Sequence, residues 1–415
     1  MTENPRRLAL EVLNQEDAYA NIALDKALSE SRLSELDRNF VTALVYGTIA
    51  KKILLIHYLS PYLKKKTKPW VQTLLVLTAY QILYMDRVPT SAATDEAVKL
   101  AKQIGGPQVA AFVNAVLRNF SRNALLPPKD FGTKYSLPDF IVQKFIGQFG
   151  KERAVRIFES LETPSSVSIR VVNGVSIQVP NLRPSELSPV GLVAASGNIA
   201  ASPDFKAGKI TLQDETSQLV ALVLDARPGD QVLDACAAPG GKTCQIAETA
   251  SVTALDLYDH KLKLIEQNAK RLHVADKIKT LKVDASEVDR HFAPKTFDKI
   301  LVDAPCSGLG LLRRKPDLKY RKKTEDFAAL QRIQLAILHS VSKVLKENGI
   351  IVYSTCTLAD EENFEVIKKF LESHSEFKQV SLIHEKANIM REGCLYITPE
   401  LYHTDGFFIA KFIKK

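Results

Sequence analysis

Four aspartates in the second half of the chain each follow a short apolar run that is typical of a buried strand. They are Asp234, Asp256, Asp284 and Asp303. If these runs are neighbouring parallel strands, the four carboxylates lie along one rim of a sheet, at the carboxyl ends of the strands. Asp256 stands 22 residues after Asp234, where a carboxylate can accept hydrogen bonds from both hydroxyls of a ribose. An acidic rim suits ribose, an adenine amino group and a cationic sulfonium, and it suits a pyrophosphate poorly, so we predict S-adenosylmethionine rather than NAD.

A glycine-rich turn follows the first of these aspartates. Residues 233–243 read LDACAAPGGKT, which predicts a strand, a turn and a helix that begins near Lys242. Gly240 and Gly241 allow the backbone to approach a ligand closely at the end of the strand. The turn does not match GxGxxG, and it does not match the phosphate-binding loop GxxxxGKT, because Cys236 stands where the first glycine of that loop would be. Phosphate binding at this turn is thereby disfavoured.

Two cysteines also stand at the ends of strand-like runs, Cys306 in DAPCSG (303–308) and Cys356 in YSTC (353–356). Carbon 5 of cytosine is a poor nucleophile, and a thiolate that adds to carbon 6 makes carbon 5 reactive, so methylation at carbon 5 requires a cysteine. An electropositive environment supplies the thiolate, and Lys242 and the run Arg313–Lys315 are candidates for it. Spacing alone does not decide which cysteine attacks. The other cysteines are predicted to be small buried side chains: Cys236, Cys244 and Cys394.

Positive charge suggests a polyanionic partner. The net charge is +9 and the isoelectric point is about 9.1, and residues 1–123 hold 16 Lys and Arg against 11 Asp and Glu, a surplus of 5. For the dense runs Lys51-Lys52 and Lys64 to Lys68, phosphate contact and solvated helix faces remain equally open. The segment LGLLRRKPDLKYRKK (309–323) carries seven basic residues against Asp317 alone. We predict that this segment grips the phosphates that flank a target base.

The periodicity of apolar residues divides the chain into three predicted domains. Residues 1–125 have helical spacing throughout, with helix breaks at Pro61, before Pro69 and at Gly105-Gly106-Pro107, and form an all-α domain. Residues 126–205, with the β-like run SSVSIRVV (165–172), form a small α+β connector. Residues 206–415 alternate strands and helices and form an α/β, Rossmann-like domain with a doubly wound parallel sheet. The predicted strands lie in 233–238, 252–258, 280–283, 299–305 and 349–356.

The remaining composition points to a cytoplasmic protein. The five cysteines are odd in number and widely spaced, with no CxxC pair and no Cys/His cluster at zinc spacing, which favours a reducing compartment and no metal. The N-terminal residues MTENPRR lead into a helical pattern without an apolar signal region, and no apolar run reaches 18 residues, so we expect no membrane segment. We also expect a monomer.

These motifs resemble those of the RNA cytosine-5 methyltransferases of the NOP2/Sun/Fmu family. The resemblance rests on LDACAAPGGKT, DAPCSGLGLLRRKPD, YSTC and the terminal DGFFIAKF (405–412). The N-terminal residues resemble the RNA-binding domain of the antitermination factor NusB, through FVTALVYGTI (40–49) and AAFVNAVLRNF (110–120). The pair of domains is similar, over nearly the whole chain, to the bacterial members that methylate small-subunit ribosomal RNA. The resemblance therefore implies RNA, and most specifically 16S ribosomal RNA, as the partner.

The resemblance also implies roles for single residues. Asp256 would hold the ribose of S-adenosylmethionine, Asp284 the adenine, and Asp303 would lie between the cofactor and the target base. The nucleophile of this family is the cysteine of the later TC motif, which is Cys356, and Cys306 would help to release the product, with Pro305 shaping its turn. The loop that would hold the methionine part consists of Cys236, Ala237, Ala238, Pro239, Gly240, Gly241 and Lys242.

Three alternatives to the methylation of carbon 5 of a cytosine in ribosomal RNA remain. Methyltransferases that act on amino groups commonly have an Asp or Asn, two prolines and an aromatic residue where this chain has Asp303-Ala304-Pro305-Cys306. A transfer RNA substrate and an inactive RNA-binding scaffold are the further alternatives, and the intact cysteines, Asp303 and glycine-rich loop argue against the scaffold. The sequence identifies neither the target nucleotide nor the base that removes its proton.

Overall fold

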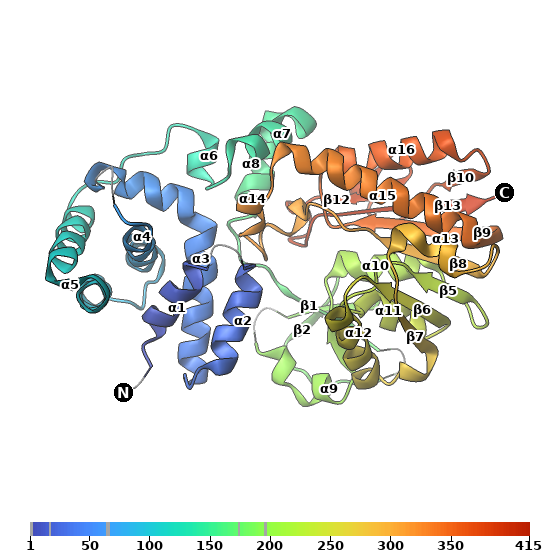
Figure 1. The fold of residues 1–415 in the computed structure, drawn as a ribbon, viewed down its shortest axis with the longest axis horizontal. Coiled ribbons are helices and arrows are strands. Elements are labelled where there is room, and N and C mark those ends of the chain that lie inside the picture. Colours follow the sequence, from blue (N-terminus) through green and yellow to red (C-terminus); the bar gives the residue numbers. More distant parts are fainter. Residues whose placement is uncertain (1–2, 16–17, 64–66, 173–174, 195–196) are drawn as a thin grey trace. The chain divides into compact units, whose positions relative to one another are not determined.

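The computed structural model describes residues 3–15, 18–63, 67–172, 175–194 and 197–415 (Figure 1). Lys64, Lys65 and Lys66 of the predicted basic run lie outside the described residues. The chain divides into two compact units. Unit 1 is Met1–Phe158 with Arg314–Arg321, and unit 2 is Glu159–Arg313 with Lys322–Lys415. The division into three domains at residues 125 and 205 stays a prediction.

Unit 1 is helical, as predicted for residues 1–125. Its fourth long helix begins at Pro69, where proline is favoured because the first turn needs no N–H donor. The next helix, α5 (Thr90–Arg122), is kinked at Gly106, which has φ +83° and precedes Pro107. The helices are α1 (Pro5–Leu13), α2 (Ala20–Glu30), α3 (Glu35–Leu59), α4 (Pro69–Tyr84), α5 (Thr90–Arg122), α6 (Phe131–Lys134), α7 (Asp139–Phe149) and α8 (Lys151–Ser160).

Helix α3 forms much of the core of unit 1. Its Leu44, Val45 and Leu55 are completely buried and pack with apolar residues of α1, α2, α4 and α5. By length and composition alone α3 is also long and apolar enough to cross a membrane. A core helix passes the same test, and the buried face of α3 accounts for its apolar composition.

The segment Arg314–Arg321, with helix α14 (Leu318–Arg321), belongs to unit 1. Lys319 is 4% exposed and its Nζ donates a hydrogen bond to the carbonyl oxygen of Ala50 at 2.7 Å. In unit 2, the Arg313 guanidinium donates to the carbonyl oxygens of Pro399 and His403, each at 2.7 Å. For Lys319 the predicted phosphate contact is therefore wrong, because its ammonium is buried and satisfies a backbone carbonyl. For the partly exposed Arg313 the contact stays a prediction.

Unit 2 contains a small antiparallel sheet with the strand order β2-β3-β1-β4. Its central strand β1 (Val167–Val171) confirms the β-like run predicted at 165–172. The other strands are β2 (Leu182–Pro184), β3 (Gly191–Ala194) and β4 (Ile210–Leu212), and the short helix α9 (Pro203–Lys206) precedes β4.

The large sheet of unit 2 has the order β11-β12-β13-β9-β8-β5-β6-β7, and β10 pairs with β13. The five predicted strands are all present and pair in parallel, from β7 to β9. The predicted parallel sheet is confirmed for these five strands, and the terminal run DGFFIAKF adds β13, which pairs antiparallel with β9 and makes the whole sheet mixed. The strands are β5 (Gln231–Asp234), β6 (Ser251–Asp256), β7 (Ile278–Lys282), β8 (Phe297–Asp303), β9 (Leu345–Thr355), β10 (Phe377–Val380), β11 (Met390–Arg391), β12 (Cys394–Ile397) and β13 (Phe407–Lys414).

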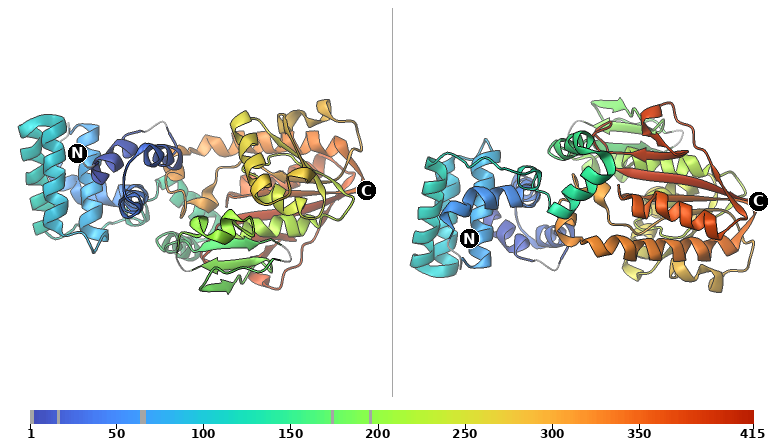
Figure 2. Two further views of the ribbon diagram at one scale, coloured as in Figure 1. Left: turned by 90° about the horizontal axis from the view of Figure 1, so that it is seen from below. Right: turned by 90° about the horizontal axis from the view of Figure 1, so that it is seen from above.

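Helices cover both faces of this sheet (Figure 2). One layer consists of α10 (Glu215–Leu224), α11 (Gly241–Ala247) and α12 (Asp259–Arg271), which contact one another in succession. The other layer consists of α13 (Val288–His291), α15 (Thr324–Val344) and α16 (Phe364–Ser373). Strands that are covered on both faces read as continuous apolar runs rather than as alternating ones, which explains why the sequence pattern located them.

Candidate active site

The parallel strands bring the predicted site residues to one rim. Asp234, Asp256 and Asp303 are the last residues of β5, β6 and β8, and Cys356 directly follows β9. Asp284 stands two residues after β7. Because these strands are parallel neighbours, their carboxyl ends meet at the same edge of the sheet, so the predicted acidic rim is confirmed.

The glycine-rich loop connects β5 to α11. The N–H of Ala237 donates to the carbonyl oxygen of Leu255 at 2.8 Å, which fixes the loop beside β6. Gly240 has φ +100°, and a Cβ at this position would lie 3.1 Å from the Cα of Ile265 in α12, so only glycine fits. The Thr243 hydroxyl donates to Asp234 at 2.7 Å, and burial raises the pKa of that aspartate to about 7.

Carboxylates flank the glycine-rich loop on the side of β6 and β7. Asp256 is 8% exposed, and its Oδ1 accepts a hydrogen bond from the N–H of Tyr258 and lies 3.6 Å from the Lys261 ammonium. Asp284 is exposed, and its Oδ1 accepts hydrogen bonds from the N–H and the hydroxyl of Ser286. A close backbone approach with acceptor groups beside it fits a nucleoside cofactor with ribose hydroxyls and an amino group.

Asp303 is held from both sides. Its Oδ2 accepts a hydrogen bond from Lys242 Nζ at 2.7 Å, and its Oδ1 accepts one from the Ser354 hydroxyl at 2.7 Å. Burial lowers the pKa of Lys242, but the charge of Asp303 outweighs burial and the pKa is raised, so the lysine stays cationic. Its ammonium also lies 5.2 Å from the ring centre of Phe407. The positive charge of Lys242 is thus held beside Asp303, at the carboxyl end of β8.

The two predicted catalytic cysteines lie in contact. Cys306 Sγ and Cys356 Sγ are 3.1 Å apart, and both side chains are partly exposed. The hydrogen bond with Cys356, followed by burial, raises the pKa of the Cys306 thiol well above its ordinary value. Of the cations predicted to stabilise a thiolate, Lys242 interacts electrostatically with Cys356, whereas Arg313 is bonded to backbone carbonyls.

Of the three cysteines predicted to be buried, Cys244 and Cys394 are buried, and burial raises the pKa of each thiol to about 12. The prediction is wrong for Cys236, which is partly exposed because it lies in the glycine-rich loop after β5. Burial also raises the pKa of Cys236 well above its ordinary value. A thiol that keeps its proton at neutral pH is a poor nucleophile, which supports the predicted lack of a catalytic role.

Four residues that contact the site escaped the sequence analysis: Ser354, Phe407, Glu362 and Asn363. Ser354 stands inside the YSTC motif, so its proximity to a catalytic cysteine was a usable signal. Glu362 and Asn363 follow Cys356 by six and seven residues in a polar stretch that looks like an exposed turn, and nothing local marks them as buried. Within the described residues, no group of three or more His, Cys, Asp or Glu side chains is placed to hold a metal ion.

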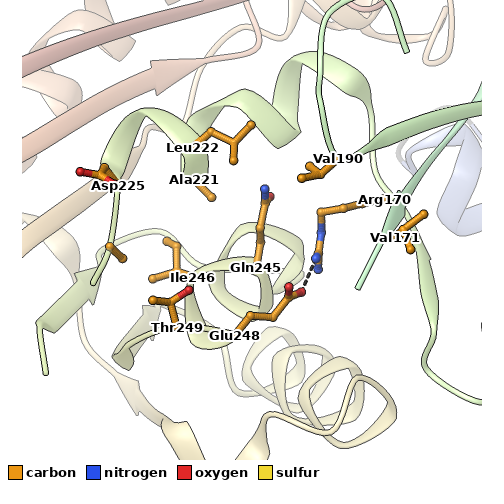
Figure 3. Close-up of a pocket in the computed structure, with 11 residues that line it drawn as sticks. Arg170, Val171, Val190, Ala221, Leu222, Asp225, Gln245, Ile246, Glu248 and Thr249 are labelled. Carbon is orange, nitrogen blue, oxygen red and sulfur yellow. Dashed lines mark hydrogen bonds and ion pairs between the residues drawn. The ribbon is translucent and has the colours of Figure 1, made fainter. Parts of the chain in front are cut away.

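A separate cavity of about 150 Å³ lies in unit 2 (Figure 3). The guanidinium of Arg170 in β1 points to Glu248, with which it forms an ion pair, and Gln245 lies beside them. The cavity lies at the C-terminal ends of α10 and α11, which precede β5 and β6, so it is at the opposite end of the strands from the rim. It contains none of the predicted site residues.

Comparison with known proteins agrees with this geometry. Residues 221–413 match the family model "16S rRNA methyltransferase RsmB/F", and residues 3–122 match the NusB family. The probable ribosomal RNA small subunit methyltransferase B of Bacillus subtilis is 40% identical, with 99% of this chain and 98% of the relative covered. The crystal structure of the protein PH0851 is similar over the full length of both chains, with a TM-score of 0.84 and 25% identity. A methyltransferase homologue from Pyrococcus horikoshii has a TM-score of 0.60 and 28% identity, over 70% of this chain and all of that one.

The fold and these matches define an S-adenosylmethionine-dependent methyltransferase that carries a NusB-type helical domain. The chain belongs to the 16S rRNA methyltransferase RsmB/F family. The resemblance seen in the sequence motifs is thereby confirmed, for the catalytic domain and for the helical domain.

Proposed function

We propose that this protein transfers the methyl group of S-adenosylmethionine to carbon 5 of a cytosine in small-subunit ribosomal RNA, with Cys356 as the covalent nucleophile. The observation that carries the proposal is the contact of the two cysteine sulfurs, 3.1 Å apart beyond β8 and β9 and beside the Asp303–Lys242 ion pair. Methyl transfer to a nitrogen or an oxygen requires no thiol, whereas carbon 5 of cytosine does. The name of the Bacillus subtilis relative supports small-subunit ribosomal RNA as the substrate.

The loop between β5 and α11 and the carboxylates beyond β6 and β7 would hold the cofactor. Asp256 would bind the ribose hydroxyls and Asp284 the adenine. S-adenosylmethionine, when bound, supplies an electrophilic methyl group. Because the Lys242 ammonium is bound to Asp303, the lysine would contribute its backbone to the cofactor. The loop residues that would surround the methionine part are Cys236, Ala237, Ala238, Pro239, Gly240, Gly241 and Lys242.

The chain's own residues perform the steps on the cytosine. The Cys356 thiolate forms a bond to carbon 6, and the electron pair of the carbon 5–carbon 6 double bond becomes available at carbon 5, which takes the methyl group. A base then removes the proton from carbon 5, the double bond re-forms, and Cys356 leaves as a thiolate. Asp303, which is fixed by Lys242 and Ser354, would lie between the target cytosine and the cofactor.

The contact between the two sulfurs supports this division of roles. Cys306 Sγ lies 3.1 Å from Cys356 Sγ, and the hydrogen bond with Cys356 and burial raise the pKa of the Cys306 thiol well above its ordinary value. The Lys242 ammonium interacts electrostatically with Cys356, which suits the attacking sulfur. The Cys306 thiol therefore contacts the sulfur that must leave in the last step, which suits it to assist release.

The NusB-type domain would supply further RNA contacts, and its surplus of positive charge is consistent with phosphate binding. We also propose that the protein acts in the cytoplasm as a monomer. Sedimentation of the purified protein at micromolar concentration tests the second statement, and a dimer there would contradict it.

The decisive experiment compares the wild type with Cys356→Ala and Cys306→Ala on protein-free small-subunit ribosomal RNA and labelled S-adenosylmethionine. We expect 5-methylcytosine at one position from the wild type and no turnover from Cys356→Ala. Cys306→Ala should accumulate a covalent protein–RNA adduct on a denaturing gel, because release fails after attack.

Other outcomes would redirect the proposal in defined ways. An adduct that needs Cys306 and survives the loss of Cys356 would reverse the two roles. Label in transfer RNA but not in ribosomal RNA would change the substrate, and label on an amino group would remove the covalent step. No label in any RNA would leave an RNA-binding scaffold.

A further inference from the structure

Two completely buried residues, Glu362 and Asn363, lie beneath the cysteine pair. They stand at the end of a short 3-10 turn, Asp360–Glu362, before α16. Burying a carboxylate is costly unless its oxygens are hydrogen-bonded, and replacing a buried ionic group with apolar ones often costs no stability. A buried carboxylate next to a reactive pair of thiols therefore calls for a reason other than stability.

Glu362 holds the loop that carries Cys306. Its Oε2 accepts hydrogen bonds from the N–H of Ser307 at 2.8 Å and from Gln334 Nε2 at 3.1 Å. Its Oε1 accepts one from the Ser307 hydroxyl at 2.5 Å. Gln334 Nε2 also donates to the carbonyl oxygen of Pro305 at 2.9 Å. Both neighbours of Cys306 in the chain are therefore fixed by hydrogen bonds, and the groups that bond the carboxylate in these contacts are donors.

Asn363 does the same for the loop that carries Cys356. Its Oδ1 accepts a hydrogen bond from the Thr355 hydroxyl at 2.5 Å, and its Nδ2 donates to the carbonyl oxygen of Thr357 at 3.0 Å. Thr355 and Thr357 are the two neighbours of Cys356 in the chain, and both are completely buried. One side chain thus bonds to the residues on either side of the nucleophile, to the hydroxyl of Thr355 and to the backbone carbonyl of Thr357.

A direct hydrogen bond joins the two loops. Ser307 Oγ and Thr357 Oγ1 are 2.7 Å apart. Either hydroxyl can donate in this contact, and Thr357 Oγ1 also accepts a weak hydrogen bond from the N–H of Ala359 at 3.3 Å. The residue after each cysteine is therefore bonded to the residue after the other.

We propose that Glu362 and Asn363 are positioning residues, which set the separation and direction of Cys306 Sγ and Cys356 Sγ through Ser307 and Thr357. We call these four residues the cysteine brace. The proposal rests on the proposed function, in which one sulfur attacks carbon 6 and the other assists its departure. Both steps need the sulfurs on the same side of one cytosine, and a misplacement of about 1 Å can cost roughly 100-fold in rate.

The charge of Glu362 supports the same role. Burial raises the pKa of Glu362, but its hydrogen bonds from Ser307 and Gln334 act in the opposite direction. The charge of this carboxylate contributes to the raised pKa of Cys306, after the larger effects of Cys356 and burial. The charge of Glu362 thus favours the thiol form at Cys306.

The test uses variants that remove one brace hydroxyl at a time, Ser307→Ala and Thr357→Val. Thr357→Ser is the conservative variant that keeps the hydroxyl. The matched control is Ser340→Ala, since Ser340 is as buried as Ser307 and its hydroxyl also donates to a carboxylate, that of Asp289 at 2.9 Å, away from the cysteines. Thermal unfolding establishes that each variant is folded.

We expect kcat to fall roughly 10- to 100-fold in Ser307→Ala and Thr357→Val, with KM for RNA and S-adenosylmethionine within about threefold of wild type. Thr357→Ser should recover most of the rate, and Ser340→Ala should keep it. A purely structural role would instead lower the unfolding temperature in all three deletion variants without separating kcat from KM. Equal kcat values in Ser307→Ala, Thr357→Val and Ser340→Ala would overturn the proposal.

A second readout needs no RNA. We expect the ratio of iodoacetamide alkylation at Cys356 to that at Cys306, read by mass spectrometry, to change at least about threefold in Glu362→Gln and Ser307→Ala and to stay at the wild-type value in Ser340→Ala. An unchanged ratio in every variant would contradict the cysteine brace even if RNA methylation were established. If the wild type methylates no RNA, the proposed function fails while this ratio still decides whether the brace exists.

Discussion

The two halves of the strand-end rim are held in different ways. Beyond β6 and β7, the carboxylates are fixed by their immediate neighbours, because Asp256 and Asp284 each accept a hydrogen bond from the N–H two residues further along the chain. Beyond β8 and β9, the contacts join distant parts of the chain. Asp303 is bonded to Ser354, 51 residues away, and Ser307 to Glu362, 55 residues away.

This difference suggests that one half of the rim determines cofactor binding and the other half determines the rate of the reaction. The first half consists of local turns at the ends of β6 and β7. Its carboxylates are hydrogen-bond acceptors, which suit the ribose hydroxyls and the amino group of the cofactor. The second half is in place only when β8, β9 and the turn before α16 are packed together, and it fixes groups that must meet a reacting base within a fraction of an ångström. We therefore expect substitutions in the first half to change the affinity for S-adenosylmethionine and substitutions in the second half to change kcat.

Asp234, at the end of β5 between the two halves, gives the largest expected effect, and it is on stability. Burial raises its pKa from 3.8 to about 7, so the folded state binds this proton more tightly than the unfolded state. The stability that this proton contributes is fully present below about pH 4 and is lost as pH rises to about 7, a loss of about 4 kcal/mol at about 1.4 kcal/mol per pKa unit. In urea unfolding at pH 5 and pH 8, the wild type should lose stability relative to Asp234→Asn as pH rises. A constant difference would show that Asp234 titrates normally.

Lys242→Met tests the second half of the rim. The ammonium bonds Asp303 and lies near Cys356, so its removal should lower kcat by roughly 100-fold, with little change in the affinity for S-adenosylmethionine. Lys261→Met is the matched control, because Lys261 pairs with Asp256 in the first half. The comparison of the two halves breaks down if Lys242→Met raises KM for the cofactor and leaves kcat unchanged in steady-state assays.

The sequence predicted the first half of the rim almost completely. The strands that end at Asp234 and Asp256 are continuous apolar runs, and a parallel arrangement of such runs requires their ends to meet. The glycine-rich turn was likewise readable, because Gly240 and its neighbours in the chain form one local motif. Local patterns were sufficient where the partners are close in sequence.

The second half was predicted only in part. Cys306 and Cys356 were recognised by their type and by their place after a strand, but the contact between their sulfurs depends on the pairing of β8 with β9. Glu362 shows the limit more clearly, and Lys319 of unit 1 shows it away from the rim, since a charged residue in a polar stretch predicts exposure and both are buried. Their carboxylate and ammonium are satisfied by residues that only tertiary folding brings near.

Asp256→Ala should weaken the binding of S-adenosylmethionine. A carboxylate that accepts hydrogen bonds from ribose contributes about 1.5–3 kcal/mol, which corresponds to an increase in Kd of roughly 10- to 100-fold. Titration calorimetry measures this directly, and kcat at saturating cofactor should stay within about threefold of wild type. The control is Asp259→Ala, because Asp259 is an exposed carboxylate three residues further along that pairs with Lys282 at 2.6 Å. Equal losses in both variants would assign the effect to general surface charge.

Asp284→Ala gives the smallest expected effect. Asp284 is exposed, and its Oδ1 is already engaged by the N–H and the hydroxyl of Ser286, so water competes for any contact with adenine and Kd should rise only about threefold. The same carboxylate caps the turn that follows β7, and its loss should cost about 1 kcal/mol of stability. Ser286→Ala separates the two effects, because it removes one partner of the turn and leaves the carboxylate. If Ser286→Ala weakens cofactor binding as much as Asp284→Ala does, the aspartate acts by shaping the turn, and direct recognition of the adenine is excluded.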